Sequence, residues 1–349
     1  MIIGVHPDHN GTESYSDHWA EFLQQRGVQV RWLDLLAPDA LNQIQGCDGV
    51  MWRWIHFPAQ KQTAHILLFM IEQELGIPVF PNQKTTWHFD NKAAQAYLLK
   101  HLGAPVPQTW VFWQETDALT WAQTAPYPVI FKLTSGAGSS NVIKVQNKRQ
   151  AEKLIRRMFH HGIFPSTMNE YRRGGMPRSL RQFLLMGKRA LQSPAYVFNA
   201  QYPQLDSVFW QPEAAYAYFQ EFLPGNEYDT RVNIIGNRAF AFRRLNRPDD
   251  FRASGSGRLL YTPAEVDSRC IEIAFTLSRN SGFQSMAYDF LYQGGLPVVN
   301  EISYTFVNKA VYDSPGHWDE QLNWHEGHMW PEEAQVEVFL QELQKPLEG

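Results

Sequence analysis

The feature that most constrains the fold is the alternation of strand and helix signals over residues 1–83. Short apolar runs predict strands at residues 2–5, 28–33, 49–52 and 78–80. Helical patterns separate them, at residues 17–26 and 59–75. Alternation of this kind is typical of parallel sheets, because parallel neighbours need a helical crossover between them. We therefore expect a small α/β layer with a parallel sheet at the start of the chain.

The composition is that of an ordinary globular protein of 349 residues, 44% hydrophobic and 19% charged, which is enough for two or three domains. The formal charge of −4 shows no bulk basic character, so nucleic acid is not an expected partner. Cys47 and Cys270 are too few and too far apart for a disulfide framework, which favours a cytoplasmic location. No stretch of the chain approaches the length of a membrane span. Residues 1–7 have no basic n-region and no long apolar core, so we expect them to form the first strand of a domain rather than a signal peptide.

The middle of the chain begins with a strong helix signal over residues 90–103, where Asp90 or Asn91 can cap the start and Gly103 can end it. Short strands are then expected over residues 105–222, with one helix near residues 148–159. Residues 165–212 are rich in Pro, Gly and aromatic side chains, so they predict a long ordered loop or insertion.

Lys132 ends an apolar run and stands before a Gly/Ser turn that includes Gly136, Gly138 and Ser139. Glycines let the backbone approach an anion closely, successive N–H groups surround its oxygens, and lysine supplies a compact positive charge. The pattern predicts a hairpin that covers a phosphate group. Such turns more often have no ligand, so the hypothesis depends on the motifs that accompany it.

Two further hairpins are predicted in the C-terminal part. The first joins residues 227–235 and 238–245, and the second joins residues 285–291 and 296–303 through Gly294-Gly295. Between them, Thr262-Pro263-Ala264-Glu265 combines an N-cap, a proline at the first helical position and a glutamate three residues after the cap. This pattern predicts a helix from there to about residue 281.

The second hairpin carries Asp289 and Glu301 on neighbouring strands. If the two glycines centre the turn, Asp289 lies opposite about position 300, close to Glu301. Side-by-side carboxylates repel each other unless a cation or a proton lies between them, and Mg²⁺ usually arrives with substrate phosphates. The alternative is structural: Asp289 pairs with an arginine and Glu301 faces solvent. Both interpretations stay open.

Residues 218–231 form a strand, a Pro-Gly turn and a second strand in the prediction. The apolar end of the first strand offers backbone groups to an adenine edge, and an acid after the turn can accept from ribose hydroxyls. The alternative interpretation is that the segment is simply a hairpin with no role in nucleotide binding. Four arginines could meet phosphates or a substrate carboxylate, with surface solvation as the alternative: Arg231, Arg243, Arg244 and Arg252.

The order of these motifs from about residue 80 to residue 306 resembles the ATP-grasp superfamily, in particular the branch of glutathione synthetase and the ribosomal-protein glutamate ligase. The resemblance implies an α/β (α+β) fold, the ATP-grasp fold, with the nucleotide held between two α+β subdomains. It implies an N-terminal α/β domain at residues 1–83, a lid subdomain at residues 84–222 with the irregular insertion, and a C-terminal subdomain at residues 223–349 with the metal-site acids.

The resemblance also implies roles for single residues. The nucleotide-binding positions are Lys92, Lys132, Gly136, Gly138, Ser139, Glu221, Phe222, Leu223 and Glu227. The catalytic positions are Arg231 and Arg244, and the metal ligands are Asp289, Glu301 and Ser303. Where the family commonly has Glu-x-Asn, this chain has Glu301-Ile302-Ser303, so that a hydroxyl stands at the expected amide position.

The reaction that the resemblance implies is ligation. A substrate carboxylate attacks the γ-phosphate of ATP, and an amine or a thiol then displaces phosphate from the acylphosphate. The expected cofactors are ATP and Mg²⁺, with Mn²⁺ as an alternative ion. The expected partners are a small-molecule carboxylate and an amine, and a homodimer is left open. A kinase of a small molecule and a non-catalytic ATP-binding protein are the alternative functions. The histidine-rich residues 317–328 are expected to form an exposed or substrate-lining loop rather than a zinc site.

Overall fold

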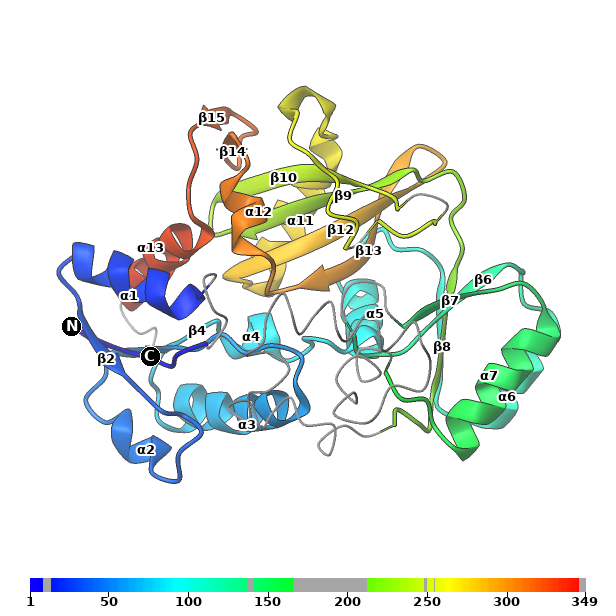
Figure 1. Cartoon of the computed structure of the whole chain (residues 1–349), viewed down its shortest axis with the longest axis horizontal. Helices are drawn as coiled ribbons and strands as arrows, with labels where there is room; N and C mark the ends of the chain where they lie inside the picture. Colours follow the sequence, from blue (N-terminus) through cyan, green and yellow to red (C-terminus); the bar gives the residue numbers. More distant parts are fainter. Residues whose placement is uncertain (9–13, 137–140, 166–211, 248–249, 254, 345–349) are drawn as a thin grey trace, which may run out of the picture. The chain divides into compact units, whose positions relative to one another are not determined.

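The computed structural model describes residues 1–8, 14–136, 141–165, 212–247, 250–253 and 255–344 (Figure 1). The chain divides into two compact units. The first contains residues 1–55, 63–109 and 222–349, and the second contains residues 56–62 and 110–221. The predicted boundary near residue 222 coincides with the return of the chain to the first unit, and the three-domain division stays a prediction. In the described part of the chain, no helix is both long and apolar enough to cross a membrane.

The N-terminal sheet of the first unit confirms the predicted parallel layer. Its strand order is β2-β1-β3-β4, and every neighbouring pair is parallel. The strands are β1 (Ile2–Val5), β2 (Gln29–Trp32), β3 (Gly49–Met51) and β4 (Val79–Phe80). The helices of this part are α1 (Tyr15–Gln25), α2 (Ala40–Gln43), α3 (Pro58–Phe69), which continues as a π-helical turn at Met70–Glu74, and α4 (Gln83–Thr86). Helix α1 begins where it does because Ser14 Oγ accepts from the backbone N–H of Asp17.

The C-terminal helix α13 (Pro331–Leu343) packs against α1 and the N-terminal sheet. Trp19 of α1 and Phe339 of α13 belong to one buried cluster with Ile3 of β1. The Trp19 indole N–H donates to Gln335 Oε1 at 2.9 Å, which satisfies a polar group that would otherwise be buried without a partner. The two ends of the chain therefore share one core.

The larger sheet of the first unit is antiparallel, with the order β13-β12-β9-β10-β14-β15 and β11 paired to β10 (Figure 1). Its strands are β9 (Tyr228–Ile235), β10 (Arg238–Leu245), β11 (Leu259–Leu260), β12 (Ser285–Gln293), β13 (Leu296–Ser303), β14 (Gly316–Trp318) and β15 (Trp324–Glu326). The helices beside it are α5 (Lys92–His101), α11 (Ser268–Ser281) and α12 (Asn308–Tyr312). Both predicted hairpins and the predicted helix after Asn91 are confirmed.

The prediction of one helix from residue 262 to residue 281 is wrong at its start. Pro263–Glu265 form a single 3₁₀ turn, after which Val266 is extended. The Asp267 carboxylate accepts from the backbone N–H of Arg269 at 3.0 Å, and α11 begins at Ser268. The competing Asp267 cap therefore decides where the helix begins.

The second unit contains a sheet of order β5-β8-β6-β7 with two helices. Its elements are β5 (Thr109–Phe112), α6 (Glu115–Trp121), β6 (Val129–Lys132), β7 (Val142–Val145), α7 (Lys148–His160) and β8 (Ala217–Glu221). The Lys132 hairpin and the helix near residues 148–159 are confirmed, whereas α6 was not predicted. Apart from its two ends, the irregular stretch predicted at residues 165–212 lies outside the described residues.

The prediction that residues 218–231 form a hairpin is wrong. Strand β8 pairs antiparallel with β6 of the second unit, whereas β9 belongs to the large sheet of the first. The reason is packing: Phe219 of β8 lies against Trp121 and Phe131, with ring centroids 4.7 and 5.5 Å away, so β8 completes that core instead of folding back on β9.

Candidate functional site

The predicted acids lie directly opposite each other on the second hairpin. Asp289 of β12 pairs with Glu301 of β13, and Phe290 pairs with Val299. Asn300 is thus the extra residue of a bulge, which shifts the pairing of Asp289 by one position from the simple expectation. Because cross-strand partners share one face of a sheet, the bulge brings the two carboxyl groups to the same face.

Asp289 is held by two arginines from the neighbouring strands. Arg231 of β9 donates from Nε and Nη2 to the two carboxylate oxygens at 2.7 and 2.9 Å. Arg244 of β10 lies 2.7 Å from Asp289 Oδ2 and also makes two hydrogen bonds of 2.6 Å to Asp229. The register explains this cluster, since Asp289 lies opposite Arg231 of β9 and Arg244 lies opposite Asp229 of β9. Arg231 and Asp229 are two residues apart on one strand, so their side chains point to the same face of the sheet.

The charges in this cluster stabilise one another. Burial alone would raise the pKa of Asp289, but the guanidinium groups of Arg231 and Arg244 outweigh burial and hold the pKa below its ordinary value. Burial alone would lower the pKa of Arg244, and its carboxylate partners instead raise it. Burial raises the pKa of Asp229, against the opposing effect of Arg244. Asp289 is therefore an ionised carboxylate in a nearly solvent-free setting.

Lys92 reaches the other acid of the pair. Its Nζ lies 3.0 Å from Glu301 Oε1, and its side chain is only 8% exposed, which makes this ion pair a semi-buried one. Helix α5 places Lys92 there because Asn91 Oδ1 caps the Ala94 N–H and because Gln95 donates to the carbonyl oxygen of Ile302 at 2.9 Å. Each carboxylate thus has a protein cation beside it.

These contacts bear on the two interpretations of the acid pair. Asp289 does pair with arginines, as the structural alternative supposed, whereas Glu301 has a lysine partner and keeps a side-chain exposure of 34%. The carboxylate repulsion expected from the sequence is offset within the protein. Two carboxylates on one face still suit a hard cation that arrives with phosphates. A role for Asp289 and Glu301 as metal ligands stays a prediction.

Ser303, the third predicted metal ligand, alternates onto the same face of β13 as Glu301. Its hydroxyl donates to the carbonyl oxygen of Thr305 at 2.8 Å. Among the described residues, no three His, Cys, Asp or Glu side chains come together as a metal site. The residues therefore fit a two-carboxylate site whose remaining ligands would come from phosphate and water, and not an all-protein cage.

Lys132 lies at the end of β6 in the second unit and is 5% exposed. In the loop after it, the backbone N–H groups of Thr134 and Ser135 donate to the Glu213 carboxylate at 2.9 and 3.2 Å. Sequence reasoning missed Glu213, because an isolated acid before β8 has no recognisable pattern. Successive N–H groups here do surround an anion, as predicted for the loop, but that anion is a side chain. Gly136 has a φ of 115°, and Gly138 and Ser139 lie outside the described residues.

The predicted adenine hinge follows β8. Glu221 is the last residue of that strand, and the Phe222 ring packs edge-to-face on Phe251 with centroids 5.7 Å apart. Asn226 fixes the turn, since its amide group donates to the Tyr292 carbonyl at 3.0 Å and accepts from the Tyr292 N–H at 2.7 Å. Leu223 is buried and Glu227 is exposed. Of the predicted adenine- and ribose-contacting residues, only Glu227 is exposed.

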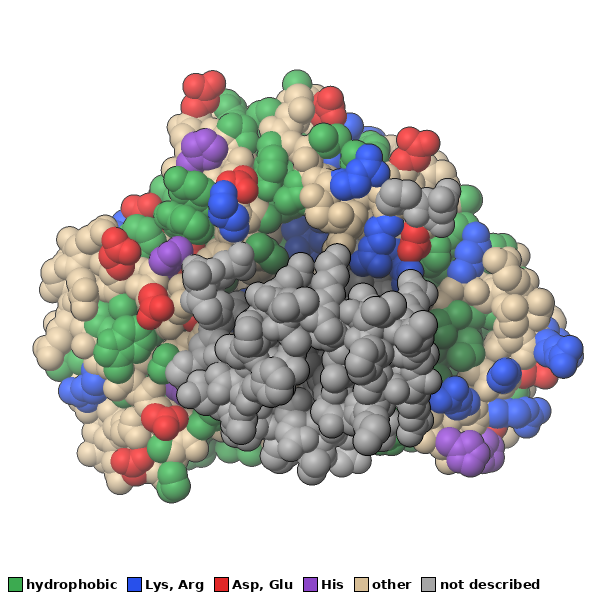
Figure 2. Space-filling model, viewed as in Figure 1, with side chains coloured by type: hydrophobic (Ala, Val, Ile, Leu, Met, Phe, Trp, Pro, Cys, Tyr) green, Lys and Arg blue, Asp and Glu red, His purple; other side chains and the backbone are tan. Residues whose placement is uncertain are grey.

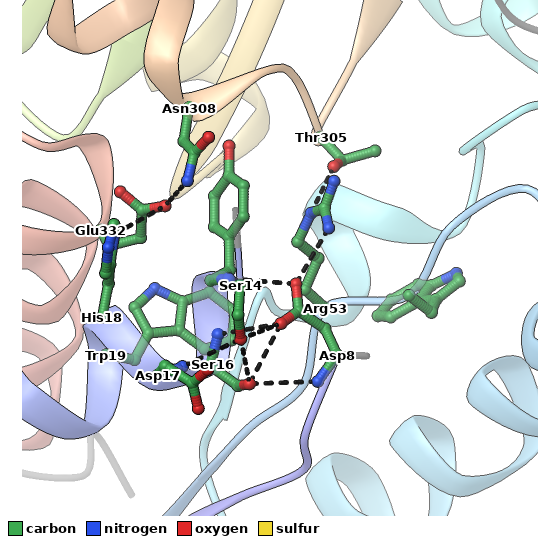
Figure 3. A network of polar contacts seen from close by, with 12 residues as sticks. Asp8, Ser14, Ser16, Asp17, His18, Trp19, Arg53, Thr305, Asn308 and Glu332 are labelled. Carbon is green, nitrogen blue, oxygen red and sulfur yellow. Dashed lines mark hydrogen bonds and ion pairs between the residues drawn. The ribbon is translucent and has the colours of Figure 1, made fainter. Parts of the chain in front are cut away.

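Sequence reasoning also missed a polar network at the carboxyl ends of the N-terminal strands (Figure 3). Asp8 follows β1, and its carboxylate accepts from the N–H groups of Tyr15 and Ser16 at the start of α1. Arg53 follows β3 and donates from Nη1 to Asp8 at 3.0 Å and from Nε to the Thr305 hydroxyl at 2.8 Å. Polar residues after neighbouring parallel strands are the signal that could have revealed this network.

The network holds the chain segment that follows Glu301. The Tyr15 hydroxyl donates to the Phe306 carbonyl at 2.8 Å, and the Trp54 N–H donates to the Tyr304 hydroxyl at 3.0 Å. Further along, Asn308 donates to the buried Glu332 at 2.6 Å. The N-terminal sheet thus fixes the end of β13, and with it the position of the acid pair.

The histidine-rich residues 317–328 form a hairpin of β14 and β15. The ring of His317 stacks on that of His325, with centroids 5.2 Å apart, and His325 Nε2 lies 2.9 Å from Asp319 Oδ2. Within the described residues, no three His, Cys, Asp or Glu side chains of this segment come together in a way that could hold a metal ion.

Comparisons with known proteins identify the fold. No family model matches the chain. Alpha-aminoadipate–LysW ligase LysX of Saccharolobus solfataricus is 29% identical over 92 residues, which are 25% of this chain and 33% of that protein. The match thus spans about a third of that curated relative's length.

Solved structures of similar fold cover nearly the whole chain. A RimK domain protein ATP-grasp from Sphaerobacter thermophilus matches 98% of this chain and 100% of its own length, with a TM-score of 0.54 and 14% identity. The D-cycloserine synthetase DcsG matches 99% of this chain and 100% of its own length, with a TM-score of 0.58 and 14% identity. The ATP-grasp ligase PsnB, complexed with a minimal precursor, matches 97% of this chain and 98% of its own length, also with a TM-score of 0.58 and 14% identity. The chain has the ATP-grasp fold, as the resemblance in its sequence predicted.

Proposed function

We propose that this protein is an ATP-dependent ligase that joins a carboxylate to an amine, or to a thiol, through an acylphosphate, with ADP and phosphate as products. The observation that carries the proposal is the charged face of β9, β10, β12 and β13, where two acids, two arginines and Lys92 meet on a sheet of an ATP-grasp fold. Phosphoryl transfer needs positioned charge more than a covalent nucleophile, and this face is built of positioned charge.

In the proposal, Lys92 and Lys132 bind phosphate oxygens as point charges. Arg231 is the arginine that meets the phosphate or the intermediate. Its Nε and Nη2 are bound to Asp289, while its Nη1 makes no hydrogen bond to any of the described residues. Arg244 is 7% exposed and shared between Asp229 and Asp289, so we assign it the positioning of Asp289 rather than contact with substrate.

The same face would hold the metal ion. Asp289 and Glu301 would be its carboxylate ligands, and the Ser303 hydroxyl would bind the ion or a water molecule on it. Mg²⁺ bound there would neutralise charge on the phosphate oxygens. Lys92 and Arg231 hold the two carboxylates in fixed directions, which prepares them as ligands.

The remaining nucleotide contacts are proposed for the hinge and the loop. Backbone groups of Glu221, Phe222 and Leu223 would meet the adenine edge, and the exposed Glu227 would accept from ribose hydroxyls. The residues after Lys132, namely Gly136, Gly138 and Ser139, would cover the phosphates and exclude water from the acylphosphate.

The similar proteins differ in what their names say they act on. PsnB is complexed with a precursor peptide and LysX is named as a ligase of LysW, whereas DcsG is a D-cycloserine synthetase. We propose a carboxylate and an amino group as the reacting pair in this chain. Two alternatives share the nucleotide half of the site, a kinase of a small molecule and a non-catalytic ATP-binding protein.

The test is ADP release measured over pairs of carboxylates and amines with Mg²⁺ present. Ligation requires both partners, a kinase releases ADP without the amine, and a binding protein releases none. In the Lys132→Ala variant we expect turnover to fall by about 10- to 150-fold, because one charge-assisted phosphate contact contributes roughly 1.5–3 kcal/mol. The control is Lys100→Ala on the exposed surface of α5. Equal turnover in the two variants would contradict the role of Lys132.

A further inference from the structure

The second unit is basic, although the whole chain is slightly acidic. Residues 110–221 contain thirteen Lys and Arg against seven Asp and Glu, while the chain as a whole has a net charge of −4. In Figure 2, blue side chains gather at the lower right, over the part of the second unit where Figure 1 labels α6 and α7. Of the thirteen Lys and Arg of residues 110–221, helix α7 supplies five: Lys148, Arg149, Lys153, Arg156 and Arg157.

Most of these side chains form one straight stripe. Arg149, Lys153, Arg156 and His160 stand at positions i, i+4, i+7 and i+11 of α7, so they fall within an arc of about 60° on a helix of 3.6 residues per turn. Arg157 lies next to the edge of this arc and is counted as the fifth member of the stripe. All five side chains are exposed. With a rise of about 1.5 Å per residue, the stripe is about 16 Å long.

Four of the stripe's cations have no partner within the described residues. His160 pairs with Glu115 at 3.1 Å, and Lys148, beside the stripe, lies 3.8 Å from Glu152. No hydrogen bond or ion pair joins a described residue to the side chains of the other four, which are Arg149, Lys153, Arg156 and Arg157. In the described part of the chain, these four cations are thus held by no ion pair.

Repulsion between like charges in the middle of the stripe opposes formation of the helix. Lys153 has like-charged neighbours at i−4, i+3 and i+4, namely Arg149, Arg156 and Arg157, and such pairs destabilise a helix. Helix α7 is instead held by its opposite face, where Ala151, Ile155 and Met158 are buried. Like charges gathered on one exposed face of a helix indicate a surface for an anionic partner.

We propose that the α7 stripe, Arg149, Lys153, Arg156, Arg157 and His160, docks an acidic segment of a polypeptide. This inference rests on the proposed function, since the segment would belong to the substrate that the ligase modifies. An extended peptide repeats its side chains on one face about every 6.6–6.8 Å, and the stripe offers a cation about every 4.5–6 Å along α7. Arginine guanidinium groups match carboxylates in planar, two-bonded geometry.

An acidic peptide fits the stripe better than a nucleic acid does. Sites for single strands add aromatic side chains on which bases stack, and double strands need broader basic surfaces that follow two phosphate rows. The aromatic residue of α7, Phe159, is not exposed, and the stripe is a single row. Nucleic acid is thus an outcome for the experiment to exclude.

The experiment measures binding of two fluorescent probes of equal charge at several salt concentrations. One is a peptide of alternating Glu and Ser with eight Glu, and the other is an oligothymidylate. The variant is Lys153→Gln with Arg156→Gln. The control, Lys100→Gln with Arg279→Gln, makes the same change of net charge on exposed residues of α5 and α11. We expect the variant to weaken peptide binding about fivefold while the control leaves it unchanged.

Binding of a non-hydrolysable ATP analogue is measured in parallel, and it should be the same in all three proteins. Equal peptide affinity in variant and control, no peptide binding by the wild type, or tighter binding of the oligothymidylate would each overturn the docking surface. Absence of ADP formation with every substrate pair, together with α7-dependent peptide binding, would count against the ligase activity and leave the docking surface standing.

Discussion

Replacing Arg244 by methionine tests the charge cluster on the large sheet. Arg244 is buried and bridges Asp229 and Asp289, and Asp289 keeps Arg231 as a second partner. Asp229 is different, because Arg244 is the cation bound to it. Methionine keeps most of the aliphatic volume and removes only the charge and the donors. The variant therefore leaves a buried carboxylate at position 229 without its counter-ion.

The expected loss is about 3–5 kcal/mol of unfolding free energy, the range for removing one partner of a buried ion pair. The first unit has roughly 230 residues, and an unfolding entropy of about 2.1 cal/mol/K per residue then converts the loss into a fall in Tm of about 6–10 °C. Arg244→Met combined with Asp229→Asn should recover part of this fall, because the orphaned charge is removed as well.

The control is Arg243→Met, one residue away on the opposite face of β10. Arg243 pairs with Glu265, whose side chain is 48% exposed, so we expect a loss of at most about 1 kcal/mol. Thermal unfolding followed by circular dichroism gives all four Tm values. An equal loss in the two single variants, or a double variant no more stable than Arg244→Met, would refute the reasoning.

The pH dependence of the Arg244→Met variant has a definite sign. In the wild type the lowered pKa of Asp289 contributes stability above its ordinary pKa, which is lost as the pH falls through the folded value. In the variant, burial without Arg244 raises the pKa of Asp229 further, so folding is favoured by taking up a proton. The difference in Tm between wild type and variant should therefore shrink from about pH 7 to about pH 4.

Two further predictions concern His18 of α1 and Ser303 of β13. The hydrogen bond to Glu332 raises the pKa of His18, so protonated His18 stabilises the fold below its ordinary pKa, and this stability is lost as the pH rises. The Tm difference between wild type and His18→Gln should therefore be larger at about pH 5.5 than at about pH 8.5. A Tm difference independent of pH would contradict this. If Ser303 supports the metal ion, Ser303→Asn should keep or raise Mg²⁺ affinity in ATP turnover and Ser303→Ala should weaken it modestly; the opposite order would show that the hydroxyl is no ligand.

The local elements of this protein could be predicted from its sequence. The parallel N-terminal layer, the helix that begins after Asn91, and both hairpins follow from hydrophobic periodicity, caps and glycine turns, which act over a few residues. The order of the motifs also pointed to the ATP-grasp fold. Prediction failed where two local signals competed, as at Thr262 and Asp267, since a cap's strength depends on which backbone groups the surrounding fold leaves free.

Which charged side chains meet could not be predicted, because it depends on contacts between distant parts of the chain. The bulge at Asn300 sets Asp289 opposite Glu301, and strand order β12-β9-β10 brings Arg231 and Arg244 to Asp289, from positions 58 and 45 residues away in the sequence. Arg53 reaches Thr305 across 252 positions. Such contacts depend on the pairing of strands and the docking of sheets, in which burial of apolar faces fixes the register and the charged side chains take the partners that this register provides.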